Sequence, residues 1–75
     1  MPRLNLTFDE VLTILQANGF TVVRQNGTSH RQLRGIVAGE VRMTTLAGKL
    51  SDDVAKGTLQ SIMRQSGLPK GLFRR

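Results

Sequence analysis

The sequence is 75 residues long, with 39% hydrophobic residues, 21% charged residues and a formal net charge of +6. A chain of this length forms one domain and buries only about 60% of the surface that its unfolded form exposes, which argues against a deep pocket for a large cofactor. The lack of cysteine excludes disulfides, thiolate metal sites and cysteine nucleophiles, and a single histidine excludes a metal site built from several histidines. Because no apolar run is long enough to cross a membrane and no secretory signal is recognisable, we expect a cytoplasmic protein with no membrane partner.

Positive charge is concentrated after the first 19 residues. Residues 1–19 hold one basic and two acidic side chains (net −1), residues 20–49 hold five basic and one acidic (net +4), and residues 54–75 hold five basic and no acidic (net +5). Eight of the eleven basic residues are arginine, which pairs with phosphate through two hydrogen bonds. This balance and the pI of about 11.5 favour a nucleic-acid partner. A solvated face, or a basic surface for an acidic protein, is the alternative.

The first expected element is a helix that begins after Thr7. Thr7-Phe8-Asp9-Glu10 has the pattern of a capping box, in which the side chains of the first and last residues satisfy each other's backbone amides. Apolar residues then recur at helical spacing, and Asn18-Gly19 is a typical helix end. The apolar stripe consists of Phe8, Val11, Leu12 and Leu15.

Three short strands follow, joined by tight turns. Residues 20–25 alternate around Phe20 and Val22, and Asn26-Gly27 predicts a turn that Thr28-Ser29 completes. Residues 30–36 and 40–46 form the next two strands, with a turn at Ala38-Gly39 between them. If Leu33 faces the core, Arg31 and Gly35 share its side, and His30, Gln32 and Arg34 face the other way. Because a charged side chain is unfavourable in an apolar core, we expect Arg31 to lie at the edge of the sheet.

A second helix is expected near the C-terminus, beginning at Ser51 or near Gly57-Thr58, and the glycine favours the later start. Gly67 and Pro69 end it, and residues 69–75 are expected to form a mobile basic tail. The predicted core consists of Phe8, Leu12, Leu15, Phe20, Val22, Leu33, Leu59, Ile62 and Met63.

The predicted order is α-β-β-β-α, an α+β fold with two helices on one face of a three-stranded antiparallel sheet. This is the arrangement of a double-stranded-RNA-binding domain, although a fold alone does not establish a function.

Several motifs resemble the HicA toxin family, also called YcfA-like, over most of residues 7–68. They are Gly19-Phe20, Val23-Arg24-Gln25-Asn26-Gly27, Ser29-His30, and the run from Gly57-Thr58-Leu59-Gln60 to Arg64-Gln65-Ser66-Gly67-Leu68. The family pattern is GF…VRQKGSH in the first hairpin and GTLRSILRQAG in the last helix. The resemblance implies a toxin of a type II toxin–antitoxin pair that cleaves mRNA without a metal or cofactor, with His30 as the catalytic histidine and a HicB-type antitoxin as the protein partner.

The sequence departs from the family pattern at three places. One residue separates glycine from serine in Gly27-Thr28-Ser29-His30, and Asn26 stands where members often have lysine. Many members also carry a proline and a second histidine in the third strand, where this chain has Thr44-Thr45-Leu46-Ala47-Gly48.

Metal-independent RNA cleavage uses the RNA's own 2′-hydroxyl as the nucleophile. A histidine suits the proton transfers because the ordinary imidazole pKa, about 6.5, is near the working pH. Arg24, Arg31 and Arg34 are candidates to bind the phosphate, together with Lys49. Backbone amides of Gly27 and Ser29 are further RNA-binding candidates, although a plain turn explains them too.

Two functions stay open at this point. The first is a ribonuclease toxin, and the second is a non-catalytic RNA-binding module or inactive toxin, because a lone histidine beside a turn is often only a polar surface residue. Adjacent Asp52 and Asp53 lack a third ligand and are typical of a loop or helix start, so we expect no metal site.

Overall fold

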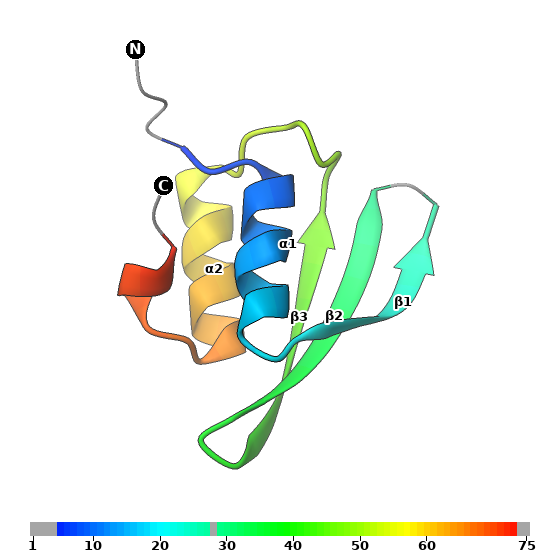
Figure 1. The fold of residues 1–75 in the computed structure, drawn as a ribbon. Helices are drawn as coiled ribbons and strands as arrows, with labels where there is room; N and C mark the ends of the chain where they lie inside the picture. The colour runs from blue at the N-terminus through cyan, green and yellow to red at the C-terminus, as the bar shows by residue number, and fades with distance from the viewer. Residues whose placement is uncertain (1–4, 28, 74–75) are drawn as a thin grey trace.

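Two helices cover one face of a three-stranded sheet in the computed structural model, which describes residues 5–27 and 29–73 (Figure 1). The elements follow in the order α1 (Phe8–Ala17), β1 (Thr21–Asn26), β2 (His30–Val37), β3 (Glu40–Ala47), α2 (Lys56–Ser66) and a short 3₁₀ turn, η1 (Lys70–Leu72). The predicted α+β fold, similar to a double-stranded-RNA-binding domain, is confirmed. None of the described helices is long and apolar enough to cross a membrane.

The capping box predicted for α1 is formed. The Glu10 amide donates to Thr7 Oγ1 over 3.2 Å, and the Thr7 amide donates to Glu10 Oε1 over 2.8 Å. Asp9 and Glu10 also place negative charge at the positive end of the helix dipole. Gly19, with φ of 91°, follows the end of the helix as predicted and turns the chain toward β1.

The sheet is antiparallel with the order β1-β2-β3, so β2 is the central strand. Ala38 and Gly39 both have positive φ, 52° and 81°, and form the tight turn expected between β2 and β3. Leu33 and Gly35 are buried against the helices, whereas His30 and Arg34 are exposed on the other face. The alternation predicted for β2 is therefore confirmed. We call the uncovered side the open face of the sheet.

A β-bulge interrupts the pairing of β1 with β2. Val22 lies opposite Leu33 and Arg24 lies opposite Gln32, so Val23 is the extra residue between them. The prediction that Val22 belongs to the core is wrong, because its side chain is 37% exposed. Every residue of β1 is exposed, since this edge strand extends beyond the cover that the helices provide.

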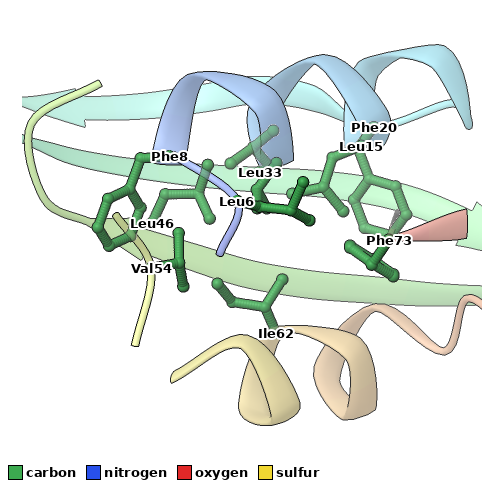
Figure 2. Close-up of a cluster of buried hydrophobic side chains, with 10 residues drawn as sticks. Leu6, Phe8, Leu15, Phe20, Leu33, Leu46, Val54, Ile62 and Phe73 are labelled. Atoms are coloured by element: carbon green, nitrogen blue, oxygen red, sulfur yellow. The ribbon is translucent and has the colours of Figure 1, made fainter. Parts of the chain in front are cut away.

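The core lies between the helices and the sheet (Figure 2). The Phe20 ring lies directly against Gly35, where a Cβ atom would come within 2.7 Å of it. Leu12, Leu59 and Met63, predicted as core residues, are only partly buried and pack against the cluster. The buried apolar residues are Leu6, Phe8, Val11, Leu15, Phe20, Leu33, Leu46, Val54, Ile62 and Phe73.

Two core residues come from segments outside the helices and strands. Leu6 precedes α1 and Val54 precedes α2, and the Val54 amide donates to the Leu6 carbonyl over 2.7 Å. Thr7 and Asp53 form an isolated antiparallel bridge beside this bond. The segment before α1 is therefore hydrogen-bonded to the loop before α2. The local sequence of either segment does not predict this contact.

The later of the two starts considered for the second helix is the observed one, since α2 begins at Lys56 and has Thr58 in its first turn. Gly67 ends it with φ of 70°, as predicted. The expectation of a free basic tail needs correction over residues 70–73, because Lys70–Leu72 form η1 and Phe73 is buried in the core. Residues 74–75 lie outside the described residues.

We predict that Gly35→Ala lowers the free energy of unfolding by about 1–3 kcal/mol, because the new methyl group would overlap the buried Phe20 ring. Gly57→Ala is the matched control, since its Cβ meets nothing within 4 Å, and it should be neutral or slightly stabilising. Urea denaturation followed by circular dichroism measures both variants. Equal stability of Gly35→Ala and the parent would contradict the close contact.

We also predict that Phe73→Ala destabilises the fold by about 3 kcal/mol, because it removes a buried aromatic side chain. Leu72→Ala, at an exposed neighbouring position, should change stability by no more than about 0.5 kcal/mol. The same denaturation experiment applies. A free tail at residues 70–73 would instead give two variants as stable as the parent.

Candidate nucleic-acid interface

A shallow depression of about 310 Å³ lies at the end of the sheet where β1 turns into β2. The register explains why its residues meet: His30 lies opposite Asn26, and Gln32 lies opposite both Arg24 and Thr45. All three strands therefore contribute polar side chains. The lining residues are Arg24, Asn26, His30, Arg31, Gln32 and Thr45.

His30 is the first residue of β2 and is exposed on the open face. Its Nδ1 lies 3.3 Å from Ser29 Oγ, so the serine orients the ring in either tautomer. The Ser29 carbonyl in turn accepts a 2.7 Å hydrogen bond from the Gly48 amide after β3. The His30 backbone is thus anchored on both sides, by pairing with β1 and by this bond to the segment beyond β3.

Gly27, which follows β1, is held by a hydrogen bond from its own strand. Gly27 has φ of 64°, and its carbonyl accepts a hydrogen bond from Gln25 Nε2 over 3.1 Å. Gly27 itself does not line the depression, and Thr28, which completes the expected turn, lies outside the described residues.

Arg24 and Arg31 both line the depression. Arg24 is exposed and reaches the open face because the bulge at Val23 reverses the alternation of β1. Arg31 belongs to the central strand, so the expectation that it lies at the sheet edge is wrong. It stands near the end of β2, half-buried, and its Nη1 is inaccessible to solvent and has no hydrogen-bond partner among the described residues. Arg31 lies opposite Leu46, so its side chain shares the covered side of β2 with Leu33 and points away from the face that presents His30.

Four of the six predicted RNA-binding residues do not line the depression: Gly27, Ser29, Arg34 and Lys49. Arg34 is exposed on the open face, four residues beyond His30, or about 13 Å along the strand. Lys49 is exposed in the segment after β3, next to the Gly48 amide that bonds Ser29. The depression therefore brings His30 and Arg24 together on the open face and leaves Arg34 and Lys49 around it, whereas the Arg31 side chain lies on the covered side.

The charged side chains on the open face are positive. Arg24 and Arg34 lie on it, and the strands contain a single acidic residue, Glu40, at the far turn. Glu40 pairs with Arg42 over 3.5 Å. None of the described residues that line the depression carries a carboxylate, so an anion that enters meets positive charge and hydrogen-bond donors.

Asn26, Gln32 and Thr45 were not predicted as site residues. Alternation already placed Gln32 on the same side as His30, so that signal was present in the sequence. Asn26 and Thr45 enter only through the pairing register, which the sequence does not specify. Their uncharged amide and hydroxyl groups add donors and acceptors suited to sugar hydroxyls and phosphate oxygens.

The described residues contain no group of three or more His, Asp or Glu side chains arranged to hold a metal ion. Asp52 and Asp53 lie in the loop before α2, where the Asp52 carbonyl accepts a hydrogen bond from the Phe8 amide. The chemistry that this geometry offers is that of one imidazole and the guanidinium group of Arg24 beside an anion site.

A comparison with protein families gives a match over residues 8–68 to the family described as "HicA toxin of bacterial toxin-antitoxin". The chain belongs to the HicA toxin family. The match spans 61 of the 75 residues, from α1 to the end of α2, and includes every residue of the depression. No curated protein and no solved structure gives a significant match. Membership of the HicA family makes the protein the toxin of a toxin–antitoxin pair, which implies a cognate antitoxin.

Proposed function

We propose that this HicA-family toxin is a metal-independent endoribonuclease that cleaves mRNA, with His30 as its catalytic residue. The observation that carries the proposal is the position of the one histidine of the chain, exposed in a depression on the same face as Arg24. A family of toxins supplies the biological context, and the open basic face supplies a surface that fits a phosphate backbone.

His30 would act as the general base. It accepts the proton of the RNA 2′-hydroxyl, whose oxygen then attacks the adjacent phosphorus while the bond from phosphorus to the 5′-oxygen breaks. The products are a 2′,3′-cyclic phosphate and a 5′-hydroxyl end, and the leaving oxygen takes its proton from water. If His30 Nδ1 donates to Ser29 Oγ, the Nε2 atom is left free to accept the proton.

Arg24 would stabilise the negative charge that develops on the phosphorus oxygens. It is exposed and lines the same depression as His30, whereas the Arg31 side chain shares the covered side of β2 with Leu33. Arg34, Lys49 and the backbone around Gly27 and Ser29 would extend the contact along the RNA. Binding of this kind tracks phosphates rather than bases, so it discriminates weakly between sequences.

A HicB-type antitoxin would neutralise the toxin by covering this face. The chain carries a net charge of +6, so an acidic protein surface associates with it quickly. RNA and antitoxin then compete for the same depression, and a complex saturated with antitoxin holds no RNA beside His30.

We predict that His30→Ala lowers the cleavage rate by at least about 100-fold, the range expected for loss of a general base. Cleavage by the parent protein should persist in EDTA and leave a 2′,3′-cyclic phosphate or its hydrolysis product. Growth arrest on expression should disappear in the variant. RNA affinity and thermal stability should stay close to the parent values, because His30 is exposed.

The control for this experiment is Thr21→Ala, another exposed polar position on the open face, which should cleave like the parent. Cleavage by His30→Ala at the parent rate would overturn the assigned role. If the parent protein binds RNA and never cleaves it, the non-catalytic binding module is the correct alternative.

We further predict that Arg24→Gln weakens RNA binding and makes its dependence on log salt concentration shallower by about 0.7, the value for one phosphate contact with a single strand. Arg64→Gln removes the same charge from α2 in the helical layer, so it should leave that slope unchanged. Fluorescence anisotropy at several salt concentrations measures both. RNA binding that does not depend on salt would show that the basic surface is not the RNA site.

A further inference from the structure

The β2–β3 hairpin extends past the ends of the helices (Figure 1). Its outer end carries exposed apolar side chains on the open face. Ile36 lies directly opposite Val41, and Met43 follows two residues further along β3. The exposed fractions of these side chains are 60%, 55% and 40%. Cross-strand partners lie within contact distance, so the three side chains form one patch. We call Ile36, Val41 and Met43 the hairpin patch.

This patch is poorly suited to RNA. Proteins bind unpaired bases by stacking them on aromatic rings or on arginine, and all three aromatic residues of this chain are buried in the core. Aliphatic side chains offer neither charge nor a hydrogen bond to a phosphate. RNA bound at the depression therefore leaves the hairpin patch exposed to water. Exposed apolar surface is unfavourable, and a protein that covered the patch would remove it from water.

The charge beside the hairpin patch identifies the kind of protein that fits it. Arg34 lies opposite Met43, between the patch and the depression, and is exposed. A second copy of this chain would bring like charges together across the contact, since each copy carries +6. A partner with apolar side chains flanked by carboxylates fits both the patch and Arg34.

The distance between the two ends of the open face fits one interface. Ile36 is six residues from His30 on the same strand, or about 20 Å. A protein interface of standard size covers about 800 Å² on each partner and extends roughly 30 Å across. One partner seated on the hairpin patch therefore also reaches the depression.

We propose that the hairpin patch is the apolar anchor for the antitoxin, an acidic protein that covers His30 from there. The inference rests on the proposed function for the competition at His30, and on family membership for the existence of an antitoxin. It divides the open face into a part that RNA and antitoxin share, with Arg24, His30 and Arg34, and a part that only the antitoxin uses.

The test separates antitoxin binding from RNA binding with the double variant Ile36→Thr/Val41→Thr, which keeps the β-branched shape and adds no charge. The antitoxin used is the protein whose co-expression restores growth to cells that express the parent toxin. Its dissociation constant should rise by about tenfold or more. RNA affinity and cleavage rate should stay within about twofold of the parent, because these exposed positions contribute little to the fold.

The matched control is Val23→Thr, which makes the same kind of change at a 51% exposed valine outside the patch. It should bind antitoxin and RNA like the parent. Met43→Gln gives a second, independent variant of the patch, and it should weaken antitoxin binding in the same direction. Circular dichroism of each variant checks that it is folded.

Unchanged antitoxin affinity in folded Ile36→Thr/Val41→Thr and Met43→Gln would overturn the inference. An equal loss of RNA affinity would also overturn it, because the patch would then belong to the RNA site. Loss of a parent self-association in analytical ultracentrifugation, with antitoxin affinity unchanged, would assign the patch to a second copy instead. Antitoxin affinities measured in the His30→Ala background need no nuclease activity, so failure of the proposed catalysis remains distinguishable from failure of this inference.

Discussion

The close contact between the Phe20 ring and Gly35 decides which face of the sheet is covered. Phe20 follows α1 directly, and the missing side chain at Gly35 lets its ring lie on the central strand. This seats the end of α1 over β2 and assigns Leu33 and Gly35 to the core side. By alternation, His30 and Gln32 must then face away from the helices. This contact and the burial of Leu33 and Leu46 on the same side together place His30 on the open face.

Local signals in the sequence predicted the helices and strands closely. The capping box at Thr7, the glycine after α1 and the Ala38-Gly39 turn each depend on a few neighbouring residues, so a short segment is enough to predict each of them. The errors involve contacts between distant segments. Burial of Phe73 depends on where η1 meets the helical layer, and exposure of Val22 depends on how far the helices extend over β1. Neither quantity is encoded within the segment concerned.

The candidate site was predictable in part, for the same reason. The face of His30 followed from alternation along β2, but the residues around it depend on register with the two neighbouring strands. Asn26 and Thr45 join the depression through that register. Arg34 and Lys49 were selected by charge, and charge alone does not place them next to the imidazole. Arg24 was selected by charge as well, although strict alternation from Val22 would have directed it toward the helices.

The bulge at Val23 accommodates one extra residue in β1 without changing which side chains face the anion site. Residues before the bulge pair in one register and residues after it pair in another, so Val23 acts as a spacer. Deletion of this residue would restore simple alternation, because Val22 already lies opposite Leu33 and Arg24 opposite Gln32, so Arg24 and Asn26 would stay on the open face. Loss of the codon for Val23 would therefore remove the irregularity in β1, while the side chains that line the anion site kept the same partners on β2.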